Sequence, residues 1–209
     1  MSKKCMVIPT EQLLEKSFIG FATKEFHDYL SIINNPENQL FLDRYETSII
    51  QEKPAEEDLS YQQIIPYTIV VHNEKIFLYE RAPPGVNTEE RLASKLTIGV
   101  GGHIEPTDED EEENIVLTSL KREIQEEIGY FEELFIRHKG YINFMDLDVD
   151  KVHFGIVFVA EIKEHNFIFD NSEIVHGEFK TITEIRAPEI YNRLENWSKV
   201  LIDNIHKIL

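Results

Sequence analysis

The chain has 209 residues, of which 42% are hydrophobic and 29% charged, and its formal net charge is −18. These values are ordinary for a globular protein with a sizeable core, but the negative field disfavours nucleic acid and anionic membranes as partners. No apolar run reaches the roughly 18–20 residues that span a bilayer, and the N-terminus does not resemble a signal peptide. The single cysteine, Cys5, excludes an intramolecular disulfide framework and a multi-cysteine zinc site. A cytoplasmic location is the default expectation.

The first part of the chain carries no readable functional code. Cys5 lies in a stretch without a clear pattern, residues 18–30 have the spacing of a partly helical segment, and residues 51–61 (QEKPAEEDLSY) form a polar loop. We therefore expect an N-terminal flank over residues 1–60 that packs on a domain over residues 61–209. The flank is expected to shape substrate specificity or to form a homodimer interface.

Strand patterns dominate the chain after residue 64. Residues 64–71 (IIPYTIVV) and 76–79 (IFLY) predict a hairpin, and residues 96–100, 135–144, 152–162 and 179–182 predict further strands. Apolar residues at helical spacing over residues 114–128, followed by Gly129, predict an amphipathic helix that ends at this glycine. Residues 188–209 predict a long helix whose Trp197, Leu201 and Ile205 pack in a core or interface. The order of elements indicates an α+β fold, because strands and helices do not alternate as in βαβ units.

Three carboxylates share one arc of the central helix. At about 100° per residue, Glu126 lies about 60° to one side of Glu123, and Glu127 lies about 40° to the other. Like charges this close repel each other, and the helix C-terminus disfavours negative charge. A solvated acidic face is one interpretation. The other is a site for a hard divalent cation such as Mg²⁺ or Mn²⁺, which prefers carboxylate oxygen.

The surrounding residues resemble the Nudix box. Residues 122–130 (REIQEEIGY) match the second half of that motif completely, and residues 101–105 (GGHIE) after a predicted strand resemble its opening. The resemblance implies a Nudix-like α/β/α sandwich with a mixed β-sheet and a loop–helix–loop metal site. It also implies that Glu123, Glu126, Glu127 and the carbonyl of Gly102 bind Mg²⁺ or Mn²⁺. Arg122 would pair with a carboxylate of the cluster, although a simple surface salt bridge is the alternative.

The chain departs from the family pattern before the helix. Arg122 lies 20 positions after Gly102, whereas the pattern places these two residues 14 positions apart, so six residues are inserted. The insertion falls in the acidic stretch over residues 106–113, and Asn114 stands where the pattern has a glutamate. Glu112 and Glu113 are adjacent substitutes. We interpret the insertion as loop elaboration with metal binding preserved.

The general base has several candidates. The resemblance implies that it comes either from the box, as Glu126 or Glu123, or from a later loop, where Glu173 and Glu178 lie. We select Glu126 and Glu173, with Arg122 as the residue that holds the cluster in place. An exposed loop glutamate without a catalytic role is the alternative interpretation of Glu173.

Substrate contacts are expected from residues near the box. Arg81 follows a predicted strand and could bind a phosphate, and His103 follows Gly102 and could line the site. A surface arginine and a solvent-facing histidine are the alternatives. His153 has the pattern of a packed or hydrogen-bonded histidine rather than a ligand. Weaker phosphate-binding candidates are Tyr67, Arg91 and Lys95.

The resemblance implies a divalent-metal-dependent hydrolase that acts on a phosphoanhydride bond. The expected substrate is a nucleoside diphosphate linked to another moiety, or a related small organic pyrophosphate. The alternative is a catalytically weak Nudix-fold domain that binds or senses a nucleotide, which the departure at Asn114 favours. An isoprenoid diphosphate isomerase is disfavoured, because it would need a catalytic cysteine in the core, whereas Cys5 lies at an end of the sequence that looks unstructured.

Overall fold

The structure is a computed structural model and describes residues 3–49, 51–83, 93–110, 112–130, 134–145, 150–163 and 174–209. The chain forms two compact units. Unit 1 comprises Met1–Pro66, Gly102–Lys121 and Gly140–Val157, and unit 2 comprises Tyr67–Gly101, Arg122–Lys139 and Phe158–Leu209. The units are interleaved along the chain, so the predicted division at residue 60 stays a prediction.

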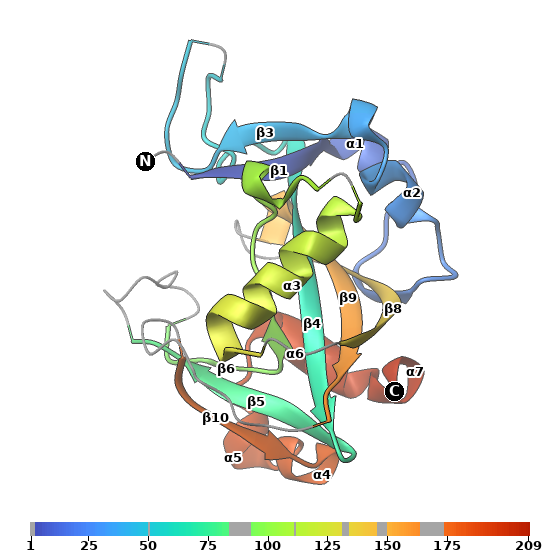
Figure 1. The fold of residues 1–209 in the computed structure, drawn as a ribbon, viewed down its shortest axis with the longest axis vertical. Coiled ribbons are helices and arrows are strands. Elements are labelled where there is room, and N and C mark those ends of the chain that lie inside the picture. The colour runs from blue at the N-terminus through green and yellow to red at the C-terminus, as the bar shows by residue number, and fades with distance from the viewer. Residues whose placement is uncertain are drawn as a thin grey trace. The chain divides into compact units, whose positions relative to one another are not determined.

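Within the described residues, ten strands are hydrogen-bonded into a mixed sheet, with the order β10-β5-β4-β9-β8-β2 along its main path. The strands are β1 (Lys4–Pro9), β2 (Gly20–Thr23), β3 (Leu40–Asp43), β4 (Tyr61–His72), β5 (Lys75–Arg81), β6 (Leu96–Thr97), β7 (Gly99–Val100), β8 (Phe135–Asn143), β9 (His153–Glu161) and β10 (Ile174–Lys180). The arrows of β4 and β9 point the same way (Figure 1), whereas the ladders β1–β3, β4–β5, β5–β10 and β2–β8 are antiparallel. The predicted mixed sheet is therefore confirmed.

Short helices accompany these strands. They are α1 (Thr10–Leu13), α2 (Tyr29–Ile33), η1 (Pro36–Asn38), η2 (Pro106–Asp108), α3 (Ile115–Ile128), η3 (Asp150–Val152), α4 (Ile182–Ile185), α5 (Pro188–Tyr191), α6 (Asn196–Asp203) and α7 (Ile205–Ile208). In the part of the chain that the structure describes, none of these helices has the length and apolar character to cross a membrane.

The predicted hairpin is confirmed as β4 and β5. Val71 pairs with Ile76, and the two turn residues Asn73 and Glu74 have φ angles of 48° and 62°. Positive φ at both central residues is the geometry of a type I′ turn, whose twist matches that of the flanking strands. This turn fixes the register of β5, and the register decides which of its side chains point toward the candidate site.

The central helix is confirmed as α3. Its predicted apolar residues are all buried, namely Ile115, Val116, Leu120, Ile124 and Ile128. The helix ends where expected, because Gly129 takes a φ of 63°, a left-handed conformation that glycine adopts without steric cost. Burial of the apolar stripe leaves the carboxylates of the box on other faces of the helix.

The N-terminal segment is more ordered than its sequence pattern indicates, and it is helical over only a small part of residues 18–30. Within residues 18–30, Gly20–Thr23 form strand β2, which pairs with β8, and only the last residues belong to helix α2. Cys5 lies in strand β1 and is fully buried, where it packs with Val7 and Ala55. Both segments are fixed by pairing with distant parts of unit 1, which local spacing does not reveal.

The expected long C-terminal helix is also wrong, since residues 188–209 form three helices. The chain breaks between α5 and α6 because its backbone pairs with β6 there: the Leu96 amide donates to the Arg193 carbonyl, and the Glu195 amide donates to the Leu96 carbonyl. The predicted packing of Leu201 and Ile205 is confirmed. The break places the Glu195 side chain inside unit 2.

Candidate functional site

The box arginine holds two of the glutamates. Arg122 Nη1 lies 2.8 Å from Glu123 Oε1 and 3.0 Å from Glu126 Oε2, so one guanidinium bridges two carboxylates on helix α3. The Glu123 side chain is 13% exposed, whereas the Glu126 side chain is 61% exposed. The structure thus brings these three predicted residues together, with Glu126 the more accessible of the two carboxylates.

Glu127 is the buried carboxylate of the box. It is 4% exposed, and its Oε2 accepts a hydrogen bond from the Tyr79 hydroxyl at 3.1 Å. The same hydroxyl lies 2.9 Å from the Gly99 carbonyl oxygen, so it contacts both helix α3 and strand β7. Burial raises the pKa of Tyr79 well above its ordinary value, with Glu127 adding to the rise, so the phenol remains a donor at neutral pH.

Gly99 permits this arrangement by its lack of a side chain. A Cβ at this position would lie 1.9 Å from Cε1 of Tyr67, which is far inside van der Waals contact. The Tyr67 ring therefore packs directly on the backbone of β7. Only glycine fits here.

Arg81 lies two residues beyond Tyr79 on β5, on the same side of the strand. Its guanidinium carbon is 5.7 Å from the centre of the Tyr79 ring, and its Nε is 4.0 Å from Glu195 Oε2, the outer limit of an ion pair. Burial acts to lower the pKa of Arg81, but Tyr79, Glu195 and Glu127 outweigh it and raise the pKa above its ordinary value. The guanidinium therefore stays charged inside unit 2.

A buried polar network holds Glu195, the carboxylate next to Arg81. The Tyr67 hydroxyl donates to Glu195 Oε1 at 2.6 Å, and the hydroxyl groups of Thr97 and Ser198 also lie within hydrogen-bond distance of it. Thr97 donates to the same Glu195 oxygen at 2.6 Å. Tyr67 is thus a buried member of this network. Burial, followed by the charge of Glu195, raises its pKa well above the ordinary value.

Sequence reasoning missed Tyr79 and Glu195. Tyr79 had a weak signal, since it alternates with Arg81 on a strand that leads toward the box. Glu195 had none, because its place in the network depends on the pairing between β6 and the segment before α6. Lys95 is exposed, while Arg91 and Glu173 lie outside the described residues.

Several other predicted residues belong to unit 1. His103 Nε2 lies 3.1 Å from His153 Nε2, which confirms that His153 is buried and hydrogen-bonded. Asn114 caps helix α3, where its Oδ1 accepts from the amide of Val116 at 2.9 Å. Asparagine is among the best residues for this position. The role predicted for the Gly102 carbonyl stays a prediction.

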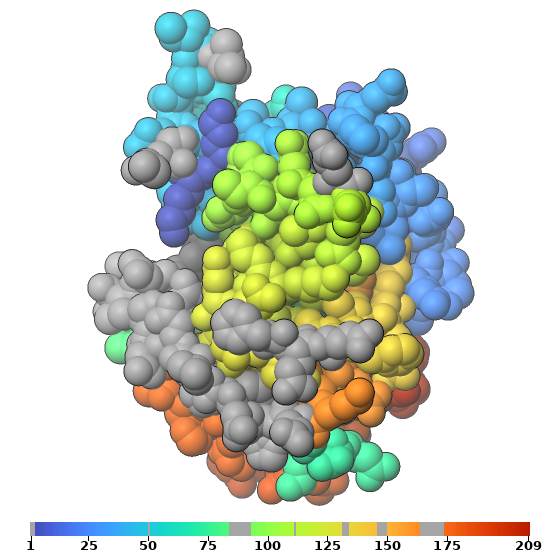
Figure 2. Space-filling model, in the orientation of Figure 1, coloured from blue at the N-terminus to red at the C-terminus, as the bar shows by residue number. Residues whose placement is uncertain are grey.

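The acidic stretch before α3 has local structure of its own. Glu105 and Asp108 form a capping box around η2, and Asp110 accepts from the amides of Glu112 and Glu113. Glu113 also pairs with the Lys121 ammonium. Figure 2 shows α3 and the residues before it on the visible face of the molecule. These contacts account for several of the inserted residues without a metal.

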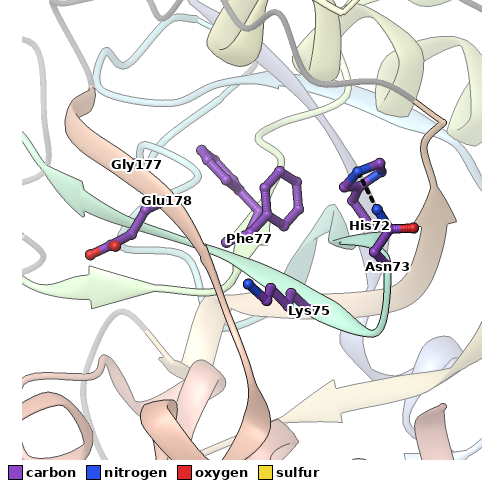
Figure 3. A pocket seen from close by; sticks show the side chains of 7 residues that line it. His72, Asn73, Lys75, Phe77, Gly177 and Glu178 are labelled. Carbon is purple, nitrogen blue, oxygen red and sulfur yellow. Dashed lines mark hydrogen bonds between the residues drawn. The ribbon is translucent and has the colours of Figure 1, made fainter.

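A separate hollow of about 450 Å³ lies on the β5–β10 ladder, and the residues that line it are His72, Asn73, Lys75, Phe77, Gly177, Glu178 and Phe179 (Figure 3). None of the box residues lines it. Glu178, the alternative loop base, lies here and pairs with Lys180 at 3.0 Å. The hollow is therefore distinct from the carboxylate cluster.

No profile of a known protein family matches the chain. Protein YmaB of Bacillus subtilis (strain 168) is 34% identical over 153 residues, which are 71% of this chain and 73% of that protein. Among solved structures, the Nudix hydrolase homologue Tm1382 has a TM-score of 0.74 at 23% identity, covering 97% of this chain and 98% of that one. The Nudix domain of Shewanella oneidensis NrtR, complexed with ADP ribose, has a TM-score of 0.53 at 13% identity, covering 70% and 87%. The chain therefore belongs to the family of Protein YmaB and has the Nudix fold that its box residues predict.

Proposed function

We propose that the protein is a divalent-metal-dependent hydrolase that cleaves the diphosphate bond of a nucleoside diphosphate linked to another moiety. The observation that supports this most strongly is the paired support of the box: Arg122 bridges Glu123 and Glu126, while the Tyr79 hydroxyl holds Glu127. A solvated acidic face would need neither a bridging arginine nor a buried tyrosine donor.

The donor set fits a hard divalent cation. Carboxylate oxygens are the ligands that Mg²⁺ and Mn²⁺ prefer, and Glu123, Glu126 and Glu127 supply them from a single helix. Burying a carboxylate such as Glu127 is costly unless donors or cations stabilise it. When bound, the metal would neutralise phosphate charge and lower the pKa of the attacking water.

The protein's own groups then have distinct tasks. We assign phosphate binding to Arg81, because its guanidinium is charged and its Nε has no hydrogen-bond partner among the described residues. Glu126 is the base that this structure favours. Its side chain is 61% exposed, against 13% for Glu123, so water can reach it. Arg122 would keep the Glu126 side chain oriented. Positioning and charge neutralisation dominate displacement at phosphorus, and these contacts supply both.

Two observations support the substrate class: the net charge of the chain and its structural similarity to the NrtR Nudix domain. A chain with a net charge of −18 repels anionic ligands except where cations gather, so the substrate should be anionic and bound at the metal and Arg81. The NrtR Nudix domain binds ADP ribose, a nucleoside diphosphate joined to a sugar. Compounds of this kind are the first substrates to test.

The deciding experiment is turnover of a panel of nucleoside diphosphate derivatives, with and without Mg²⁺ or Mn²⁺. Wild type should turn over at least one of them only with metal, and Glu127→Gln should lose nearly all activity while remaining folded. The matched control is Glu161→Gln, since Glu161 is an exposed residue at the end of β9 and should retain full activity.

The second candidate function is nucleotide binding without turnover, which Asn114 in place of the family glutamate favours. Under this alternative, calorimetry would detect binding of ADP ribose or a similar compound, while no member of the panel would be cleaved. That pair of results would replace the hydrolase proposal.

A further inference from the structure

Unit 1 contains a cluster of two histidines and one glutamate. Glu56 lies in the turn before β4, His103 lies in the loop after β7, and His153 is the first residue of β9. Their ligand atoms all lie within 4.8 Å of one another. Three segments far apart in the sequence thus converge on one point with donor groups of the kind that transition metals bind.

Each of these segments is held by its backbone. The Glu56 amide donates to the Arg44 carbonyl, and the preceding amide of Ala55 donates to the Asp43 carbonyl, so the turn is tied to the end of β3. The loop with His103 is tied to β1, because the Met6 amide donates to the Ile104 carbonyl. The cluster is therefore preorganised, with little ordering left for a bound ion to impose.

The two imidazoles face each other through the same nitrogen. His103 Nε2 and His153 Nε2 are 3.1 Å apart, and His153 Nε2 is 3.9 Å from Glu56 Oε1. Two ligands at about 2.1 Å from a tetrahedral zinc ion are about 3.4 Å apart, close to the observed nitrogen separation. Without an ion, one of the two nitrogens must carry a proton and donate it to the other.

Glu56 offers a buried carboxylate oxygen as a cation ligand. Arg44 donates to Oε1 from both Nε and Nη2, at 3.1 and 2.7 Å. Glu56 Oε2 is buried, and it has no hydrogen-bond partner among the described residues. A buried carboxylate oxygen without a partner is costly. Arg44 occupies Oε1, which is also the oxygen 3.9 Å from His153 Nε2, so Oε2 is the carboxylate oxygen that remains available to a metal ion.

We propose that Glu56, His103 and His153 bind a first-row transition-metal ion of the zinc class, at a site separate from the box glutamates. Imidazole and a single carboxylate oxygen suit Zn²⁺ or Co²⁺, whereas Mg²⁺ prefers oxygen ligands alone. Three protein ligands leave a coordination position open. The ion joins the segment before β4 to the loop after β7 and to β9, so it stabilises unit 1.

The thiol of Cys5 is near this cluster but is not a ligand. Its Sγ donates to Gln63 Oε1 at 3.2 Å, and the pKa of the thiol is raised to about 12, chiefly by burial. A thiolate ligand would add a sulfur-to-metal charge-transfer band in the near ultraviolet to the spectrum of the Co²⁺ protein. The proposed site predicts a visible spectrum without that band.

The test uses the full chain freed of metal by chelation and titrated with Co²⁺ in excess Mg²⁺, which occupies carboxylate-only sites. The wild type should bind one Co²⁺ per chain with a visible spectrum of imidazole and oxygen ligation. His103→Gln should weaken this binding by at least about 100-fold, since even the loss of an outer-shell partner costs 10- to 100-fold. Zn²⁺ at about 100 times its Kd should raise the Tm of the wild type by about 5–10 °C.

Two controls separate this site from others. His176→Gln is the matched control, because His176 is an exposed histidine that lies 3.8 Å from a glutamate, Glu178, and its loss should leave Co²⁺ binding unchanged. Glu127→Gln should also keep the Co²⁺ site, so failure of the hydrolase proposal would not affect this one. If the wild type retains no Co²⁺ or Zn²⁺ in excess Mg²⁺, or if His103→Gln retains it fully, the proposal is overturned.

A measurement on the wild type alone covers the case in which a variant misfolds. In ¹⁵N NMR of the imidazoles, Zn²⁺ should shift the Nε2 signals of both His103 and His153 and remove the exchangeable proton between them. Signals that do not change on addition of Zn²⁺ would show that the pair is only a hydrogen-bonded contact, and this result would also overturn the proposal.

Discussion

Tyr79→Phe tests how the candidate site positions its buried carboxylate. The change removes only a hydroxyl group, which donates to Glu127 Oε2 at 3.1 Å and lies 2.9 Å from the Gly99 carbonyl oxygen. The ring itself stacks on Phe77, with centroids 5.6 Å apart, and this packing is retained. The substitution therefore isolates the contribution of the hydroxyl group, with its contacts to Glu127 and Gly99.

The expected magnitude follows from the type of hydrogen bond. A bond to a charged group is worth about 1.5–3 kcal/mol, and each 1.36 kcal/mol corresponds to a tenfold change. Loss of the donor to Glu127 should therefore weaken Mn²⁺ binding at the box by about 10- to 100-fold. Hydrolysis at low metal concentration should fall by a similar factor and recover in part when the metal concentration is raised.

The assay is Mn²⁺ binding followed by electron paramagnetic resonance, together with the metal dependence of turnover. Tyr29→Phe is the matched control, since Tyr29 is a fully buried tyrosine of unit 1 whose hydroxyl donates to the Lys16 carbonyl. It should cost stability of about 0.5–1.5 kcal/mol without changing metal affinity. If Tyr79→Phe binds Mn²⁺ within twofold of the wild type, the hydroxyl does not position Glu127, and the reasoning is refuted.

Three further predictions concern stability. Gly99→Ala should lower the free energy of unfolding by about 1–3 kcal/mol, because the added Cβ would lie 1.9 Å from the Tyr67 ring; an unchanged denaturant midpoint would contradict this. Asn114→Ala should lower the free energy of unfolding by about 1 kcal/mol through loss of the helix cap, as measured by thermal denaturation. Asn114→Asp should keep the wild-type stability, because aspartate also caps helices. Burial raises the pKa values of Cys5 and Tyr29 to about 12, so the folded state holds these protons more tightly than the unfolded chain does. Stability should be constant up to about pH 9 and then fall by up to about 1.4 kcal/mol per pH unit for each group as the pH approaches 12; a denaturant midpoint that does not move up to pH 11 would contradict this.

The parts of the fold that sequence predicts are those with local signals. Helix α3 is predicted to within one residue of its bounds, because its apolar residues repeat at helical spacing and Gly129 ends it. The β4–β5 hairpin is predicted because a short polar turn separates two β-branched runs. In both cases the information lies within a few residues of the structure it determines. The Nudix box is also local, since its second half fits within nine consecutive residues.

The parts that sequence does not predict depend on long-range pairing. Nothing near Glu195 shows that the chain will break there, because the break follows from backbone hydrogen bonds with Leu96 on β6. Nothing near Cys5 shows that it will be buried, since its neighbours Val7 and Ala55 come together only when β1 pairs in unit 1. The hydrogen-bonded network next to Arg81 cannot be predicted from the sequence for the same reason. Its members are separated by up to 131 positions in the chain.

Asn114 stands where the Nudix box has a glutamate, and this departure bears most directly on whether the protein is a hydrolase or a nucleotide-binding domain. Asn114 acts as a helix cap, and its hydrogen bonds are made with the first turn of α3. The contacts that hold the box carboxylates involve other groups, namely Arg122 for Glu123 and Glu126, and Tyr79 for Glu127. Since these supports are intact, loss of the family glutamate at position 114 removes one carboxylate and leaves three in place. A chain that had lost hydrolysis would have no need to retain both a bridging arginine and a buried tyrosine donor, so the geometry favours a hydrolase.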